Sequence, residues 1–227
     1  MMRRLGVGVQ MTSLFVRAKA LLVAVIVPLA LAGCGYNTLP TKDEQVKAAW
    51  AEVQNQYQRR ADLIPNLVAT VQGYAQQERT VLREVVEARA SATQVRVDAS
   101  TLTDEAAFQR YAAAQDQLSG VLGRLLSVTE NYPELRSNTN FMALQSQLEG
   151  TENRIGIARR DYNGAVQDFN TTVRTFPNAL WAKTAHGWAK PYPTFSAREG
   201  SDRPPTVNFP APAAPPPAGG FQAAPAQ

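Results

Sequence analysis

Residues 46–74 read VKAAWAEVQNQYQRRADLIPNLVATVQGY, and this stretch decides the fold because its apolar and aromatic residues recur in steps of three and four. This spacing places them on one face of an α-helix and is typical of long helices that pack along a shared seam. The step between Tyr57 and Ile64 falls on Arg60, so the predicted packing face contains one charge. The seam residues are Val46, Trp50, Val53, Tyr57, Ile64, Leu67, Val71 and Tyr74.

Pro65 leaves two structures open for this stretch. A proline inside a helix removes one backbone hydrogen bond and clashes with the preceding turn, which costs about 3 kcal/mol or more. One structure is a single long helix kinked near Pro65, which the unbroken phase of the seam favours. The other is a first helix that ends near Arg60 and a second that begins with Asp62 as its cap.

The start of the first helix is predicted from two residues with the spacing of a capping box. Thr41 and Glu44 lie three positions apart, so each side chain can satisfy a backbone N–H of the first turn. This spacing predicts that residues 34–40 form a short tether and that the bundle begins at Thr41.

Two further long helices are predicted. The first is capped by Thr103, with Asp104 in its first turn, and ends at Pro133. The second follows the RSNTN segment at 136–140 and ends at Pro177. Their seams are Phe108, Tyr111, Gln115, Leu118, Leu122, Leu125 and Val128, then Phe141, Leu144, Leu148, Thr151, Ile155, Ala158, Tyr162, Phe169, Val173 and Phe176. The glycines expected to mark close helix contacts are Gly120, Gly123, Gly150, Gly156 and Gly164.

Long antiparallel helices with short connections form a bundle. We therefore predict an all-α fold, an elongated antiparallel helical bundle over residues 41–178. It has four helices, or three long ones with the first kinked near Pro65. Residues 179–209 predict a short helix and an extended segment that pack on the bundle. Residues 210–227 are rich in proline and alanine and predict a disordered tail.

The aromatic residues after Pro177 have two interpretations. We expect them to pack along the bundle, and the alternative is a position at a membrane interface with their polar tips in water. They are Trp181, Trp188, Tyr192 and Phe195. The only histidine, His186, is expected to be a surface or packed residue rather than a metal ligand.

The only cysteine, Cys34, predicts a lipid anchor. It follows basic residues and the apolar run ALLVAVIVPLALAG at 20–33, which is the order of a signal peptide. The run is shorter than the roughly 20 residues that span a bilayer core. The LAGC sequence at 31–34 resembles the bacterial lipobox. That resemblance implies that residues 1–33 are cleaved off and that Cys34 is acylated with fatty acids such as palmitate.

This signal predicts a place in the bacterial cell envelope. The protein would be lipid-anchored and face away from the cytoplasm, at the outer membrane or in the periplasm where the organism has one. The alternative is an uncleaved, single-pass N-terminal transmembrane anchor. Met11 is an alternative start, because the chain from there to Cys34 is a complete signal by itself.

The charge of the chain argues against a nucleic-acid partner. The net charge of +4 comes from 23 basic and 19 acidic residues, but residues 1–33 hold four of the basic ones and no acidic one. The chain from Cys34 onward therefore has 19 residues of each sign. A balanced chain lacks the basic surface that binds phosphate backbones.

Several segments, taken in order, resemble the LemA family. They are WAEVQNQYQRRADLIPNLVATVQGYAQQE at 50–78, ARA at 88–90, the segment 118–178 that begins LSGVLGRLL, and PTVNF at 205–209. The resemblance implies a four-helix bundle outside the cytoplasmic membrane, attached by an N-terminal hydrophobic segment. Many members keep that segment as a transmembrane helix, so the lipobox is a departure. The resemblance implies no secure activity, only an association with membranes, including magnetosome membranes in one branch.

Eleven polar residues of these motifs are candidate site residues. We interpret them as a structural polar motif, in which ion pairs fix the register of long helices. The alternatives are an anion site built from arginines, or a metal-dependent enzyme that uses Glu149, Glu152 and Asp161. No thiol, histidine or Glu-x-x-His pair accompanies them, which disfavours catalysis and metal binding. They are Arg59, Arg60, Asp62, Asn66, Glu149, Glu152, Asn153, Arg154, Arg159, Arg160 and Asp161.

The sequence therefore predicts a lipid-anchored binding, scaffold or adaptor module that is not an enzyme and needs no cofactor. Its predicted partners are the membrane, through lipidated Cys34, and an unidentified envelope protein or a second copy of the chain. No small-molecule substrate is predicted. The alternative is a protein that remodels membranes directly through its aromatic segment.

Overall fold

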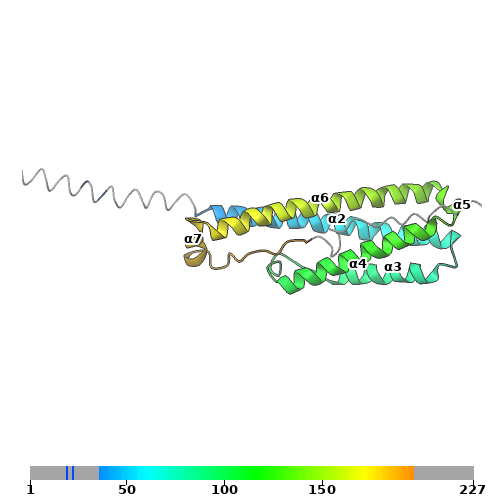
Figure 1. Cartoon of the computed structure of the whole chain (residues 1–227), viewed down its shortest axis with the longest axis horizontal. Helices are drawn as coiled ribbons and strands as arrows, with labels where there is room; N and C mark the ends of the chain where they lie inside the picture. Colours follow the sequence, from blue (N-terminus) through cyan, green and yellow to red (C-terminus); the bar gives the residue numbers. More distant parts are fainter. Residues whose placement is uncertain (1–18, 20–21, 23–35, 197–227) are drawn as a thin grey trace, which may run out of the picture. The chain divides into compact units, whose positions relative to one another are not determined.

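The computed structural model describes Lys19, Leu22 and residues 36–196. Within residues 36–196 every regular element is an α-helix, which confirms the all-α bundle. The long helices α2 and α6 run antiparallel and pack side by side, and α3 packs along α4 (Figure 1). The helices are α2 (Thr38–Tyr74), α3 (Arg79–Gln94), α4 (Glu105–Thr129), α5 (Pro133–Arg136), α6 (Thr139–Arg174) and α7 (Asn178–Thr184).

The bundle belongs to one compact unit of the chain. Contacts separate Met1–Phe195, which contains the bundle, from Ser196–Gln227. Apart from Lys19 and Leu22, the predicted signal peptide lies outside the described residues, as do Cys34 and the proline-rich tail.

Helix α2 is continuous through Pro65, so of the two alternatives the restart at Asp62 is wrong. Pro65 has no N–H, and the carbonyl of Ala61, four residues earlier, therefore lacks its usual donor within the helix. Arg89 of α3 replaces that donor, because its Nε donates to the Ala61 carbonyl at 2.9 Å. The hydrogen bond from α3 explains how the helix accepts a proline in its interior.

We expect the effect of losing Arg89 to depend on Pro65. Arg89→Met removes the donor to a part-buried carbonyl and should lower the free energy of unfolding by about 1–2 kcal/mol. In a Pro65→Ala background the new backbone N–H at position 65 satisfies the Ala61 carbonyl, so the same change should cost clearly less. Urea unfolding of the four chains measures this coupling. Equal losses in both backgrounds would contradict the assignment.

The first helix begins earlier than predicted. Its first residue is Thr38, and the Thr41 hydroxyl donates back to the Asn37 carbonyl at 2.8 Å, one turn into the helix. The capping box at Thr41 is therefore wrong, and the predicted tether loses residues 38–40 to the helix. The reason is tertiary, since Leu39 is fully buried, and Pro40 is tolerated because a first-turn N–H needs no partner within the helix.

Caps of the later helices differ from prediction in one case. Asp104, not Thr103, is the cap of α4, and its carboxylate accepts from the Ala107 N–H at 3.1 Å. Asn138 caps α6 within the predicted segment, accepting from the backbone N–H groups of residues 140 and 141. Pro133 does not end α4, which stops at Thr129, but begins the short α5.

Helix α3 has no counterpart in the sequence prediction. Its buried residues are Leu82, Val85, Ala88 and Ala92, so half of its seam is alanine. Alanine contributes little to a hydrophobic pattern, so the spacing of apolar residues does not reveal this helix. Residues 36–196 contain six helices, and α3 joins α2, α4 and α6 as a fourth long one in place of a second half of α2.

The apolar core has two parts, which lie on either side of Arg60. One surrounds Trp50, Phe108 and Tyr162, and the other surrounds Ile64 and Leu122. The predicted seams are buried along most of their length. The exceptions lie at helix ends, where Tyr74 is 44% and Phe176 87% exposed.

The glycines do not mark close helix contacts. A Cβ added at Gly120, Gly123, Gly156 or Gly164 would meet nothing within 4 Å, and at Gly150 only the Arg154 side chain. The first four are exposed, so they leave shallow places on the bundle surface instead.

Candidate functional site

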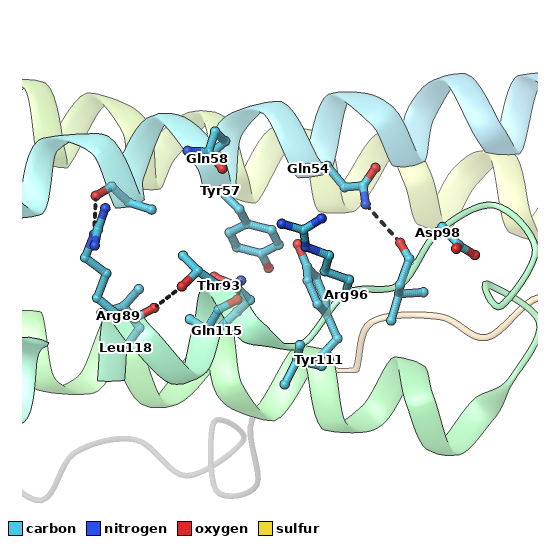
Figure 2. Close-up of a pocket in the computed structure, with 14 residues that line it drawn as sticks. Gln54, Tyr57, Gln58, Arg89, Thr93, Arg96, Asp98, Tyr111, Gln115 and Leu118 are labelled. Atoms are coloured by element: carbon cyan, nitrogen blue, oxygen red, sulfur yellow. Dashed lines mark hydrogen bonds between the residues drawn. The ribbon is translucent and has the colours of Figure 1, made fainter. Parts of the chain in front are cut away.

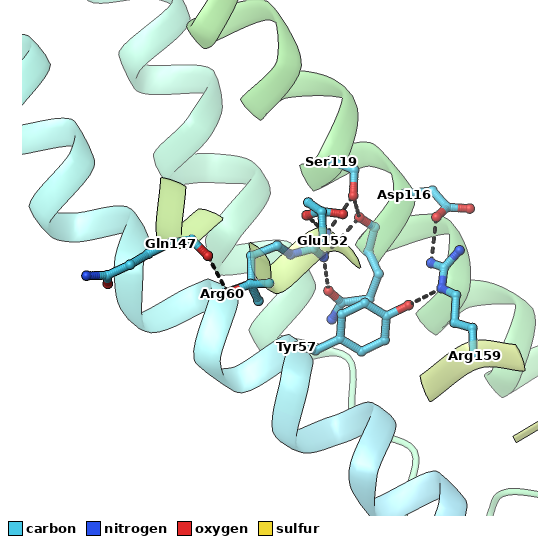
Figure 3. A network of polar contacts seen from close by, with 9 residues as sticks. Tyr57, Arg60, Asp116, Ser119, Gln147, Glu152 and Arg159 are labelled. Atoms are coloured by element: carbon cyan, nitrogen blue, oxygen red, sulfur yellow. Dashed lines mark hydrogen bonds and ion pairs between the residues drawn. The ribbon is translucent and has the colours of Figure 1, made fainter. Parts of the chain in front are cut away.

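Arg60 is fully buried and reaches from α2 to both α4 and α6 (Figure 3). Its Nη1 donates to Glu152 Oε1 at 2.8 Å and to the hydroxyl of Ser119. Its Nη2 donates to Gln115 Oε1 at 2.6 Å and to the carbonyl of Gln115 at 3.2 Å. One side chain thereby joins three helices at the boundary between the two parts of the core.

Arg159 of α6 makes a second set of contacts beside the first. Its Nε donates to the Tyr57 hydroxyl at 2.6 Å and its Nη2 to Asp116 Oδ1 at 2.7 Å. Burial raises the pKa of Tyr57, and the Arg159 cation offsets part of that rise. Burial disfavours the charged form of Arg159, but Tyr57 and Asp116 raise its pKa above the ordinary value. The tyrosine stays neutral and the arginine stays charged near neutral pH.

These two sets of contacts form one feature, which we call the polar layer. Its charged groups are paired with one another, and each pair joins residues of different helices. Arg60 is fully buried, Arg159 is 22% exposed, and their carboxylate partners Glu152 and Asp116 are 39% and 31% exposed. Partly buried pairs of this kind fix which faces of neighbouring helices meet, although they add little net stability. The layer consists of Tyr57, Arg60, Gln115, Asp116, Ser119, Glu152 and Arg159.

Only three of the eleven predicted residues lie in the polar layer, namely Arg60, Glu152 and Arg159. The other eight are exposed. The structure does not bring the three acidic residues of the enzyme alternative together, since no group of three His, Cys, Asp or Glu in the described part of the chain could hold a metal ion. The exposed residues are Arg59, Asp62, Asn66, Glu149, Asn153, Arg154, Arg160 and Asp161.

Four residues of the polar layer come from outside the predicted motif list. Gln115 could have been identified from the sequence, because it is a polar residue at a position of the α4 seam, as Arg60 is in the α2 seam. One polar residue in each of two apolar seams indicates that the two side chains can pair with each other across the helices. Asp116 and Ser119 flank the seam, where polar residues are ordinary, and carry no such signal.

A pocket of about 420 Å³ lies beside the polar layer, against Tyr57 and Gln115 (Figure 2). Its other walls are the end of α3 and the connection to α4, including Arg89, Arg96 and Val97. Polar groups at these walls hold the connection in place. The carbonyl of Val97 accepts from Trp50 Nε1 at 3.0 Å and from Gln54 Nε2 at 2.9 Å.

Residues 191–195, which we call the strap, lie along α6. Asn170 exchanges two hydrogen bonds of 2.9 Å with the backbone of Tyr192, and Asn163 does the same with Phe195. The hydroxyl of Tyr192 donates to the buried Asp43 at 2.6 Å, and burial and this bond raise the pKa of Tyr192. Phe195 covers Arg159, whose guanidinium carbon lies 4.7 Å from its ring centre.

The two asparagines should hold the strap independently. Asn170→Leu removes the acceptor for the Tyr192 N–H, so we expect hydrogen exchange at that amide to speed up by tenfold or more if about 1.4 kcal/mol of protection is lost. The Phe195 amide, held by Asn163, should change much less. Asn163→Leu is the matched control and should give the reverse pattern. Equal acceleration of exchange at both amides would show that the whole strap detaches from α6 as one unit.

The start of α2 and the helix α7 meet through aromatic side chains. The Tyr36 ring lies 5.7 Å from that of Trp181 and 4.8 Å from that of His186, measured between centres. His186 is 6% exposed, and its Nε2 is 3.0 Å from the Tyr36 carbonyl. Of the two expectations for His186, the packed one describes its position.

The described helices do not include one that is long and apolar enough to cross a membrane. The apolar run at 20–33 falls almost entirely outside the described residues.

Comparison with known proteins agrees with the resemblance in the sequence. The chain is 26% identical over 191 aligned positions to magnetosome protein MamQ 2 of Paramagnetospirillum magneticum, covering 77% of this chain and 69% of that protein. It is 24% identical to magnetosome protein MamQ of Magnetospirillum gryphiswaldense with the same coverage, and 21% identical over 140 positions to protein LemA of Metamycoplasma hominis, covering 62% and 60%. The LemA family model matches residues 49–209, most of the chain, and this protein therefore belongs to the LemA family.

Proposed function

We propose that this protein is a membrane-anchored binding module of the cell envelope, a scaffold or adaptor without catalysis. The relatives named as magnetosome proteins support an association with membranes. The N-terminal apolar run and Cys34 would supply the anchor.

The observation that carries this proposal is the pairing within the polar layer. Arg60 and Arg159 are each committed to a carboxylate of another helix, Glu152 and Asp116 respectively. An active site needs an acid, base or nucleophile that can reach a substrate. Here the charges instead align three helices, which is what a module needs in order to present a fixed surface.

The outer face of α6 is the surface we assign to a partner. It carries exposed apolar residues, Met142 and Ile157, each 49% exposed. Gly156 and Gly164 on the same helix leave open space beside them. A partner can approach the helix backbone closely at such positions.

Photocrosslinking in intact cells tests the proposal. A photoreactive residue at Ile157 or Met142 should capture one and the same envelope protein. Val86 of α3 is the matched control, because it is an apolar residue of similar exposure, 51%, on another helix. Capture of a second copy of the chain at the α6 positions would make the module a scaffold. Capture at Val86 alone, or of lipid alone, would contradict the proposal.

The anchor itself is tested by intact mass of the membrane-extracted protein. We expect a chain that begins at Cys34 and carries added acyl mass, and Cys34→Ala should leave an uncut precursor. An uncut wild-type chain without acyl mass would instead establish a transmembrane anchor.

A further inference from the structure

Exposed apolar side chains gather at one end of the bundle. The described chain has nine large hydrophobic residues that are exposed, and four of them are Tyr36, Phe176, Leu180 and Trp188. Phe176 is 87% exposed, the highest of the nine. These residues belong to the start of the described bundle and to the segment that follows α6. We call Tyr36 together with residues 176–190 the cap.

Contacts within the cap show that it is one surface. Tyr36 packs on Trp181 of α7 and on His186, and the His186 ring lies 5.6 Å from that of Trp188, measured between centres. Figure 1 shows α7 at the same end of the bundle as the beginning of α2. The exposed aromatic side chains are therefore held at the point where the chain enters the bundle.

The position of the anchor brings this end close to a membrane. Tyr36 is two residues after Cys34, and two residues span at most about 7 Å. This holds whether Cys34 carries lipid or the apolar run crosses the bilayer. The step rests on the N-terminal anchoring that is part of the proposed function.

The charge of the same segment suits a membrane with anionic lipid. Residues 174–196 contain Arg174, Lys183 and Lys190 and no acidic residue. Lys183 and Lys190 are exposed, and neither has an ion pair among the described residues. Segments that rest at the boundary between lipid headgroups and acyl chains are typically rich in tryptophan, tyrosine and lysine.

We propose that the cap docks on the surface of the anchoring membrane, with Phe176, Leu180 and Trp188 at the acyl boundary and Lys183 and Lys190 on anionic headgroups. The anchor then holds the chain at the membrane, and the cap fixes the orientation of the bundle. This arrangement gives a function to exposed aromatic residues that no element within residues 36–196 covers.

Tryptophan quenching by brominated lipid tests the proposal on the full, anchored chain. The protein is reconstituted into vesicles of phosphatidylcholine and phosphatidylglycerol, with or without bromine on the phosphatidylcholine acyl chains. We expect quenching in the wild type that is lost in Trp188→Phe. The matched control adds Tyr74→Trp to Trp188→Phe, which places a tryptophan at an exposed position at the far end of α2. That tryptophan should not be quenched.

The outcomes separate the docking from the anchoring. If the protein floats with vesicles but Trp188 is quenched no more than the tryptophan of the Tyr74→Trp control, the cap does not touch lipid and the docking proposal is wrong. If the protein does not float at all, the chain is not anchored, and both the anchoring and the docking proposals are wrong.

A charge reversal tests the preference for anionic lipid. Lys183→Glu with Lys190→Glu should reduce Trp188 quenching on the mixed vesicles. The matched control, Arg79→Glu with Arg83→Glu, makes the same charge change on exposed residues of α3 and should leave quenching unchanged. Equal quenching in both double variants would overturn the role assigned to anionic headgroups.

Discussion

Arg60→Ala is expected to lower the free energy of unfolding by about 2–5 kcal/mol, the range for truncating a large buried side chain to alanine. The Arg60 side chain is 0% exposed and donates to groups on α4 and α6. Alanine would leave the Gln115 oxygens without those donors and a cavity where the guanidinium lies. Urea unfolding of the full chain, followed by circular dichroism, measures the loss.

Arg60→Met is the control for this experiment. Methionine fills much of the same volume without a charge, and the Glu152 carboxylate left behind is 39% exposed, so water can solvate it. We expect Arg60→Met to recover most of the stability lost in Arg60→Ala. A methionine variant as unstable as the alanine variant would show that the hydrogen bonds, rather than the filled volume, dominate at this position.

Trp50→Ala is expected to cost a similar 3–5 kcal/mol, roughly the range for removing a large aromatic residue from a core. Trp50 is 2% exposed, and its ring centre lies 5.3–5.7 Å from those of Phe108, Tyr111 and Tyr162. Its Nε1 also donates to the Val97 carbonyl, which holds the connection between α3 and α4.

Trp50→Phe separates the ring packing from that hydrogen bond. Phenylalanine keeps an aromatic ring, and Gln54 still donates to the Val97 carbonyl at 2.9 Å, so the carbonyl is not left unsatisfied. We therefore expect Trp50→Phe to lose less than half of what Trp50→Ala loses. Equal losses for the two variants would mean that the tryptophan acts through its N–H group.

The long helices could be predicted from sequence because steps of three and four are a direct consequence of helix geometry. The same steps place Arg60 at a core position, but they do not identify its partners. Arg60 of α2 is paired with Glu152 of α6, whereas Arg159 of α6 is paired with Asp116 of α4. Sequence spacing fixes which residues share a face of one helix and not which faces meet.

The errors at helix starts have a similar cause. A capping box is a local pattern, and the burial of Leu39 extends α2 past it. Helix α3 is absent from the prediction because Ala88 and Ala92 give little hydrophobic signal, although they are buried. In each case the deciding energy comes from contacts between different elements, and the hydrogen bond from Arg89 to the Ala61 carbonyl is another such contact.

The unbroken path of α2 through Pro65 has a consequence for geometry at the membrane. At about 1.5 Å per residue, its 37 residues give a rod of about 55 Å with one helical phase from end to end. The chain enters at one end of this rod, so the rod sets the height above the entry point at which each side chain is held. It also sets the direction around the helix axis in which each side chain points, because successive residues are about 100° apart. One residue inserted within α2 would therefore rotate every residue after it by about 100° relative to the end at which the chain enters.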